Sequence, residues 1–313
     1  MEESIEYDTE DATTNEDTTT NEEESEPLVS LDHLTGIKSA KEKLALYERV
    51  VRFNKMRADN GLPYVNAPLH AMFLGSPGTG KTTVAKLMGK MLRRAGVLSR
   101  GHVVIKERAT LLGQNYNSES EKTLKALEEA QGGILFIDEA YQLYQGDDPR
   151  DPGKFVIETL MTALADESNR DWMLILAGYP DNMMKMLNMN PGFKSRIPDS
   201  NIYVFDDYTE QELMEIAENY LTSNHYSLSD EARSALAKRV NIDYLHRDKS
   251  FGNARYIINM IQTDILPAMA RRVTSAETFD CKTLTEILPC DIPSRDTTPA
   301  RHSESRQRIG FTI

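Results

Sequence analysis

The segment that most constrains this chain is Gly-Ser-Pro-Gly-Thr-Gly-Lys-Thr at residues 75–82, which matches the phosphate-loop pattern G-x-x-x-x-G-K-[ST] in full. An apolar run precedes it at residues 69–74. The residues that follow place apolar side chains at helical spacing: Val84, Leu87, Met88, Met91 and Leu92. Glycines let the backbone curl so that successive N–H groups and a helix N-terminus surround a phosphate. A strand, this loop and a helix therefore predict a nucleoside triphosphate site rather than a chance glycine-rich turn.

The loop residues have expected roles in binding ATP and Mg²⁺. We expect the Lys81 ammonium to reach the β- and γ-phosphates and the Thr82 hydroxyl to bind Mg²⁺. The residues expected to contact the nucleotide here are Ser76, Pro77, Gly78, Thr79, Gly80, Lys81, Thr82 and Thr83.

A second motif is the apolar run at residues 134–137, which ends in Asp138 and Glu139. A buried parallel strand delivers such carboxylates to the carboxyl edge of a sheet, where ligands bind. Asp138 is the natural partner, direct or through water, of Mg²⁺ held by Thr82, because Mg²⁺ prefers hard oxygen ligands. Glu139 remains free to orient and deprotonate the attacking water. The alternative, that the two carboxylates only cap a core strand, is disfavoured by the phosphate loop.

The net charge of −13 is concentrated in the first residues, since residues 1–26 hold 12 acidic and no basic side chains. The rest of the chain holds 37 acidic and 36 basic residues. We expect an acidic disordered tail at residues 1–27, because it has too little apolar surface to offset the entropy of ordering. The near-neutral remainder argues against a nucleic-acid partner, which needs a basic surface.

Targeting and cysteine patterns add further expectations. The sequence has no secretory signal and no apolar stretch of the ~20 residues that span a bilayer, so we expect a cytoplasmic protein without a membrane partner. Cys281 and Cys290 lack the spacing of metal ligands, and free thiols are expected.

Strand and helix patterns alternate through the first two thirds of the chain. Strands are expected near residues 70–75, 102–106, 133–138, 173–178 and 201–205, and helices at 81–95, 118–131, 153–168 and 181–188. Another helix is expected to end near Asn60. This alternation predicts an α/β fold in residues 28–205, with a parallel five-stranded sheet flanked by helices.

From Thr209 the pattern becomes purely helical. A capping box at residues 209–212 begins one helix, and the last helix is expected to end near Val273. We expect a small helical domain at residues 206–275. Residues 276–313 are rich in Ser, Thr, Arg and Pro, and we expect a flexible tail there.

These motifs resemble those of the AAA+ ATPases and, within them, the group of the red-type Rubisco activase CbbX and stage V sporulation protein K. The resemblance covers residues 28–273. Besides the two phosphate motifs it rests on the segments 34–37, 136–141, 176–179, 190–197 and 251–255. It implies a P-loop AAA+ domain with a C-terminal helical lid. It also implies a homo-oligomeric ring, usually a hexamer, with ATP bound between neighbours and a central pore that engages polypeptide.

The resemblance also implies roles for individual residues. Arg196 is similar to the arginine finger that reaches the γ-phosphate bound by the next subunit; outside this motif it would be interpreted as a surface arginine. Arg255, which opens the last lid helix, is similar to the sensor that ties the lid to the phosphates. Gly36 and Ile37 would line the adenine pocket.

Two aromatic residues depart from the family pattern. Tyr179 ends the fourth strand, where many relatives have Asn, and either a polar sensor or a packing role fits it. Tyr116 lies one position later than the usual pore-loop aromatic, so it either contacts a protein client in the pore or packs under its own loop. Lys194 stands where relatives often carry a second arginine, which leaves Arg196 as the finger.

The function predicted from these features is an ATP-hydrolysing, protein-remodelling motor that acts as a ring on an unidentified protein client. One alternative is a nucleic-acid motor or loader, which the charge balance disfavours. Another is a nucleotide-gated scaffold with little turnover, which the complete set of catalytic residues disfavours: Lys81, Asp138, Glu139 and Arg196.

Overall fold

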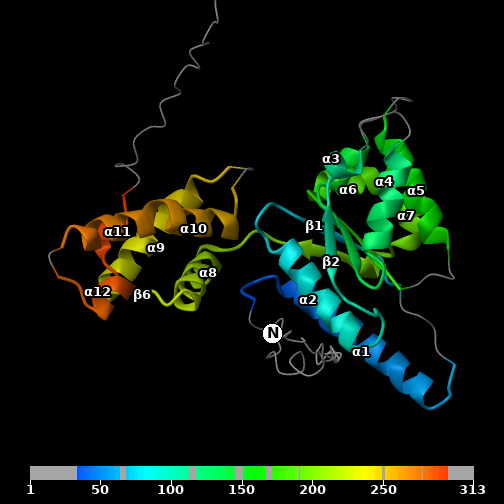
Figure 1. Ribbon diagram of the computed structural model, residues 1–313, viewed down its shortest axis with the longest axis horizontal. Helices are drawn as coiled ribbons and strands as arrows, with labels where there is room; N and C mark the ends of the chain where they lie inside the picture. The colour runs from blue at the N-terminus through cyan, green and yellow to red at the C-terminus, as the bar shows by residue number, and fades with distance from the viewer. Residues whose placement is uncertain are drawn as a thin grey trace, which may run out of the picture.

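In the computed structural model, a five-stranded parallel sheet forms the centre of the domain that precedes the lid, with strand order β2-β3-β4-β1-β5 (Figure 1). The structure describes residues 34–63, 68–112, 118–144, 151–166, 171–189, 191–248, 251–276 and 278–294. The strands are β1 (Ala71–Gly75), β2 (Val103–Lys106), β3 (Ile134–Ile137), β4 (Met173–Gly178) and β5 (Ile202–Phe205). The expected sheet is therefore confirmed.

Helices cover both faces of the sheet (Figure 1). One face carries α1 (Lys38–Asp59) and α2 (Lys81–Arg94). The other carries α3 (Arg108–Leu111), α4 (Ser118–Glu129), α5 (Gly153–Ala165), α6 (Pro180–Met189) and α7 (Pro191–Arg196). Short 3₁₀ turns, η2 (Ala140–Leu143) and η3 (Asp199–Asn201), follow β3 and precede β5.

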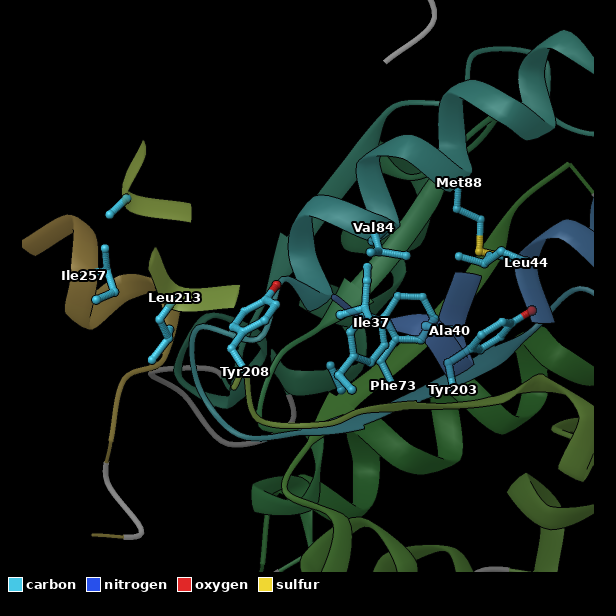
Figure 2. Close-up of a cluster of buried hydrophobic side chains, with 14 of the residues drawn as sticks. Ile37, Ala40, Leu44, Phe73, Val84, Met88, Tyr203, Tyr208, Leu213 and Ile257 are labelled. Carbon is cyan, nitrogen blue, oxygen red and sulfur yellow. The ribbon is translucent and has the colours of Figure 1, made fainter. Parts of the chain in front are cut away.

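The structure has two hydrophobic clusters, one on each face of the sheet, because side chains alternate between the faces along each strand. Successive side chains of a strand point to opposite faces, so Phe73 of β1 packs in the cluster beneath α1 and α2, whereas Met72 and Leu74 pack in the cluster beneath α4, α5 and α6. Figure 2 shows the first cluster, in which Leu44 of α1 and Met88 of α2 lie near Phe73. Every residue of β1, β3 and β4 is buried, as expected for strands covered on both faces.

The lid follows β5. Its first helix, α8 (Glu210–Ser223), begins at the expected capping box: the Thr209 hydroxyl accepts from the Glu212 N–H, and the Glu212 carboxylate accepts from the Thr209 N–H at 2.8 Å. After α9 (Asp230–Leu245) comes a segment with three parts, α10 (Ala254–Met260), the π-turn η4 (Ile261–Ile265) and α11 (Leu266–Thr274). Pro267 lacks an N–H for the regular α-helical bond, which accounts for the π-turn before it. Among the described residues no helix is long and apolar enough to cross a membrane.

Two expectations about the C-terminal part are wrong. The lid is not purely helical, because β6 (Ser227–Leu228) pairs in parallel with β7 (Glu286–Ile287). The flexible tail does not begin at residue 276, because α12 (Cys281–Thr285), β7 and the turn η5 (Pro289–Asp291) form part of the lid. These elements have two to five residues, too few to show a periodic pattern, and residues distant in sequence hold them.

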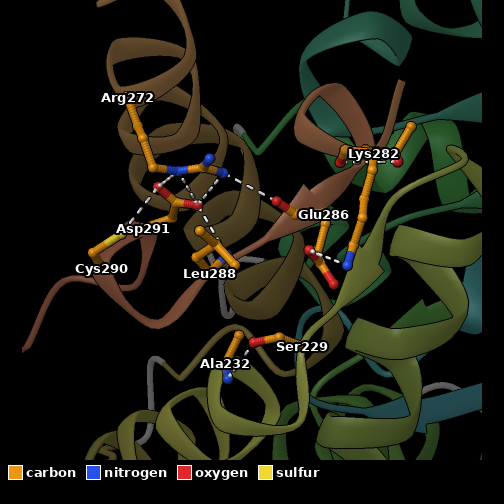
Figure 3. A network of polar contacts seen from close by, with 9 residues as sticks. Ser229, Ala232, Arg272, Lys282, Glu286, Leu288, Cys290 and Asp291 are labelled. Atoms are coloured by element: carbon orange, nitrogen blue, oxygen red, sulfur yellow. Dashed lines mark hydrogen bonds and ion pairs between the residues drawn. The ribbon is translucent and has the colours of Figure 1, made fainter. Parts of the chain in front are cut away.

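The contact between Arg272 and Asp291 fixes this C-terminal segment on α11 (Figure 3). Asp291 is 1% exposed, and its carboxylate accepts from Arg272 Nε at 2.9 Å and Nη2 at 2.8 Å. Arg272 Nη2 also donates to the Glu286 carbonyl at 3.0 Å, and the Leu288 N–H donates to Asp291 at 2.9 Å. Ile287 beside it is fully buried. Residues 295–313 lie outside the described ranges.

Candidate nucleotide-binding site

The loop between β1 and α2 has a shape that only glycine permits at two positions. Gly78 and Gly80 have φ values of 73° and 90°, in the left-handed region that other residues rarely adopt. A Cβ on Gly78 would also overlap the Gly252 carbonyl oxygen of the lid. The loop leads directly into α2 at Lys81, where the first-turn N–H groups have no partner within the helix. This cradle fits a phosphate group.

Charged groups from the edge of the sheet and from the lid act on Lys81. Its Nζ donates to the carbonyl oxygens of Gly75 and Ser76, both at 2.8 Å. Burial lowers the pKa of the Lys81 ammonium; the Asp138 carboxylate opposes this shift, and the Arg255 guanidinium adds to it. The sheet residue Asp138 and the lid residue Arg255 are therefore both close to the phosphate loop.

The carboxylates Asp138 and Glu139 reach the site because of the strand order. They follow β3, the phosphate loop follows β1, and β4 lies between these two parallel strands, so all three strand ends share one edge. Glu139 has a φ of 47°, and its carboxylate accepts from the Gln142 side chain. The Asp138 carboxylate accepts from the Glu139 N–H at 3.0 Å. Thr82 and Asp138 supply hard oxygen donors, which suit Mg²⁺.

Tyr179 directly follows β4, and its surroundings fit both a packing role and a polar role. Its ring packs edge-to-face against Tyr141, with centroids 6.3 Å apart. Burial, the neighbouring Tyr141 and the Glu139 carboxylate all raise the pKa of the Tyr179 hydroxyl, so this hydroxyl stays protonated at neutral pH. Tyr179 both packs and presents a donor group near Glu139.

The expected adenine-pocket residues lie where the sheet domain meets the lid. Gly36 and Ile37 have φ values of 67° and 47°, and Ile37 is 7% exposed. A Cβ on Gly36 would lie 2.9 Å from both the Glu212 carboxylate and the Tyr208 ring. Figure 2 shows Ile37 and Tyr208 in the same apolar cluster.

The structure adds residues that the sequence analysis missed. The Tyr208 hydroxyl donates to the Thr79 carbonyl at 3.3 Å, and burial raises the pKa of Tyr208 to about 12. Asn253, which is fully buried, bonds both Asp207 and Tyr208. Asp207 and Tyr208 follow β5 at the ligand-binding edge of the sheet, and this position could have indicated from the sequence that they lie near the site. Gln142, which orients Glu139, had no comparable signal.

Arg196 is not brought to this site within the chain. It ends α7, where its Nη1 donates to the Gly192 carbonyl at 3.2 Å. Its charge instead acts on His70, which precedes β1, whereas the phosphate loop follows β1. Five strand residues separate these two ends by ~16 Å. The expected pore residue Tyr116 lies outside the described residues, and its role stays a prediction.

A phosphate loop, a pair of strand-end carboxylates and a helical lid on a five-stranded parallel sheet define a P-loop nucleoside triphosphatase with a lid. Two family models match the chain: "ATPase family associated with various cellular activities (AAA)" over residues 71–197 and "AAA lid domain" over residues 209–302.

Curated relatives agree with these models. Protein CbbX of Cereibacter sphaeroides is 39% identical over 270 residues, which cover 85% of each chain. Stage V sporulation protein K of Bacillus subtilis is 39% identical over 252 residues, which cover 79% of this chain and 75% of the relative. The chain therefore belongs to the AAA+ ATPases, in the group that contains these two proteins.

A solved structure supports the same fold. The RuvB Holliday junction branch migration motor of Thermotoga maritima aligns with a TM-score of 0.52 over 82% of this chain and 70% of its own. The two sequences are 21% identical, so this similarity concerns the fold alone.

Proposed function

We propose that this AAA+ ATPase is a protein-remodelling motor that works as a homo-oligomeric ring, with six subunits as is usual for the family. The observation that carries the proposal is that the phosphate loop meets both the edge of the sheet that ends in Asp138 and Glu139 and the lid. The Ala254 N–H of the lid donates to the Gly78 carbonyl at 3.2 Å, and the charge of the adjacent Arg255 acts on Lys81. Such a site senses nucleotide from both domains, because a change at the phosphates alters contacts on each side.

The binding roles follow from position. The loop residues 76–83 surround the phosphates, Lys81 neutralises their charge, and Gly36 and Ile37 border the base. Thr82 and Asp138 would hold Mg²⁺, which would supply positive charge against the phosphates.

The hydrolytic roles fall to the groups at the strand ends. Glu139 orients the attacking water and accepts its proton, and Gln142 fixes the Glu139 carboxylate. Arg255 contacts the phosphates from the lid. The Tyr179 hydroxyl lies near Glu139, where it can donate a hydrogen bond to the attacking water.

The location of Arg196 supports a ring. A guanidinium carries a permanent charge, and one placed on the γ-phosphate speeds phosphoryl transfer by about 10³ to 10⁵. Since Arg196 lies at the opposite end of β1 from its own phosphate loop, we infer that it serves the site of a neighbouring subunit.

The proposed substrate class is a polypeptide, engaged by Tyr116 in the pore. An aromatic ring holds extended chains of many sequences, because it offers a large apolar face with little side-chain entropy to lose. The near-neutral charge of residues 27–313 offers no strong attraction for nucleic acid. The identity of the client does not follow from a shared motor domain.

Two variants test the division of roles at the site. We predict that Lys81→Ala abolishes nucleotide binding, whereas Glu139→Gln binds ATP normally and loses hydrolysis by at least about 10², because only the water-activating base is removed. Equilibrium binding of a fluorescent ATP analogue and steady-state ATPase assays measure the two effects.

Exposed residues provide matched controls for both changes. Lys86→Ala on the outer face of α2 and Glu158→Gln on α5 remove the same charges away from the site, and both variants should behave as wild type. If Glu139→Gln binds ATP as poorly as Lys81→Ala, the assignment of Glu139 to catalysis alone is wrong.

The Glu139→Gln variant also tests the substrate class. A ring that holds ATP without turnover should retain its client, so an affinity-tagged Glu139→Gln protein should enrich a defined polypeptide over Lys81→Ala when both are captured from the same extract. Equal capture by both variants, or enrichment of nucleic acid in place of protein, contradicts a protein-remodelling role.

A further inference from the structure

Asn253 joins three parts of the molecule through one buried carboxamide. It precedes α10, and its side chain is fully buried. Its Oδ1 accepts from the Tyr208 N–H at 3.1 Å, and its Nδ2 donates to the Asp207 carboxylate at 2.9 Å. The same Nδ2 lies 3.3 Å from the Pro77 carbonyl of the phosphate loop. The loop, the connector at residues 206–209 and the lid therefore meet at Asn253.

The backbone of Asn253 is strained. Its φ of 49° and ψ of −127° fall in a region that glycine adopts and other residues avoid. Such strain persists only where surrounding contacts over-determine the conformation, and it gathers at switch regions. The described non-glycine residues with positive φ are Asn253, Ile37, Glu139 and His225; the first three border the candidate site. The side-chain bonds of Asn253 and the backbone bonds beside it oppose a change of this conformation.

The adjacent backbone makes a second, direct contact with the phosphate loop. The Ala254 N–H donates to the Gly78 carbonyl at 3.2 Å, and Gly252 packs so closely that Gly78 has no room for a Cβ. Arg255, the lid residue whose charge acts on Lys81, comes next in the chain. A shift of the loop around a phosphate would thus displace the start of α10 and its arginine together.

We propose that Asn253 is a positioning residue that couples occupancy of the phosphate loop to the orientation of the lid. Its carboxamide keeps loop, connector and α10 in one arrangement, and this arrangement directs Arg255 towards the phosphates. The inference rests on the proposed function, since it requires ATP to bind at the loop. The strain at Asn253 favours a change of arrangement once its bonds to the connector or the loop are lost.

The chemistry of the junction explains why an amide is needed. Oδ1 must accept from a backbone N–H while Nδ2 donates to a carboxylate and to a carbonyl, and an amide offers one acceptor and two donors. A carboxylate at this position would face the Asp207 carboxylate and lose both donors. A glycine would relieve the backbone strain and remove all side-chain bonds.

Hydrogen exchange with and without a non-hydrolysable ATP analogue tests the coupling on the full chain. In the wild type, the analogue with Mg²⁺ should slow exchange both in the first turn of α2 and in α10 (Ala254–Met260), by about tenfold or more. In Asn253→Gly, the first turn of α2 should still respond, but the response of α10 should fall to within about twofold of none. A purely structural role would lower the melting temperature without separating these two responses.

A matched control and a paired substitution sharpen the test. His225→Gly relieves positive φ at an exposed lid residue and should keep the full response of α10. Asn253→Asp should abolish the α10 response. Adding Asp207→Asn should restore part of it, because donor and acceptor then exchange places across the 2.9 Å contact.

The outcomes separate the inference from the proposed function. If wild-type protein does not bind the analogue, both fail. If it binds but α10 responds equally in wild type and Asn253→Gly, only the coupling role of Asn253 is overturned. If Asn253→Gly does not fold, Asn253→Asp is compared with the double variant that also carries Asp207→Asn. Loss of the α10 response in the single variant and partial recovery in the double variant support the role of Asn253. An unaltered response in the single variant refutes it.

Discussion

At the scale of the residue, Lys81 of the nucleotide site is held where burial opposes its charge. Burial lowers the pKa of Lys81 in the folded chain, which means that folding disfavours its protonated form. Asp138 and Glu139 offset this effect without cancelling it, and the strained Glu139 and Asn253 lie close by. Desolvated charge and local strain are typical of residues that bind and process ligands.

A second residue, His70, leads to a prediction about how stability depends on pH. Burial, with a smaller effect of the Arg196 charge, lowers the pKa of His70 from 6.5 to about 4. Between these values the unfolded chain binds more protons than the folded chain, so His70 makes stability fall as the pH drops from 6.5 to 4. The full loss from this residue is at most ~3 kcal/mol. Unfolding of wild type and His70→Asn by urea at pH 7.5 and 5.0 measures it.

His70→Asn is the suitable variant because its side chain can still accept from the Leu174 N–H, as His70 Nδ1 does at 3.1 Å. The variant should lose less stability than wild type between the two pH values. The exposed His225→Asn variant should lose as much as wild type. Equal losses for all three proteins would show that His70 titrates similarly in both states.

At the scale of elements, the lid depends on a segment that no local pattern indicates. The strand β7 adds to β6, and η5 places Asp291 beneath Arg272 (Figure 3). The Arg239 guanidinium contributes from α9, donating to the Pro293 carbonyl at 2.7 Å. Residues 281–293 thereby tie α9 to α11, and we infer that the lid does not fold stably without them.

Removing the Asp291 carboxylate should destabilise the lid. Asp291→Ala leaves the Arg272 Nε and the Leu288 N–H without their acceptor in a partly buried place, and the Arg272 guanidinium keeps only its bond to the Glu286 carbonyl. We expect a loss of about 2–4 kcal/mol, less than for a fully buried pair because the Arg272 side chain is 24% exposed. Thermal unfolding and hydrogen exchange in α11 provide the measurement.

The matched control is a surface ion pair in the same segment. Lys282 lies 3.5 Å from Glu286 and is 74% exposed, so Lys282→Ala should cost less than ~1 kcal/mol. If Asp291→Ala unfolds no more easily than Lys282→Ala, the C-terminal segment is not an integral part of the lid.

At the scale of the whole molecule, the sheet separates Arg196 from the phosphate loop of the same chain. The carboxyl ends of β1, β3 and β4 hold the loop and its carboxylates, while Arg196 lies near the start of β1. A parallel sheet fixes this separation, because its strands are rigid and all point the same way. In the proposed ring, one subunit would present Arg196 to the phosphate loop of the next.

Mixing experiments test this arrangement. Arg196→Ala should bind ATP but hydrolyse it about 10³-fold or more slowly, and wild-type activity per subunit should rise with protein concentration as rings assemble. Arg196→Ala and Lys81→Ala chains, each inactive alone, should regain activity when mixed, because an intact loop can then face an intact arginine. Lys194→Ala, two positions away, is the matched control and should retain most activity.

Absence of recovery at every mixing ratio would contradict the proposed role of Arg196 across subunits, provided that sedimentation shows mixed rings. Recovery would place the arginine and the phosphate loop on different chains.

Local sequence patterns were sufficient for the five strands of the sheet, for the longer helices and for the phosphate loop. The helix that begins at Lys81 and the strand that ends before Asp138 each arise from residues adjacent in the chain, whose apolar spacing fixes which face is buried. The phosphate loop and the capping box at Thr209 likewise depend on neighbours within eight residues. Short-range geometry determines such features, so the sequence alone predicts them.

Tertiary structure decided which of these elements meet. Asn253 and Pro77 are 176 positions apart, and nothing in either neighbourhood indicates that they share a hydrogen bond. The pairing of β6 with β7 and the contact of Arg272 with Asp291 are equally non-local. Their geometry depends on how the sheet, connector and lid pack together as a whole, because the free energy of such contacts is gained only after the intervening chain has folded.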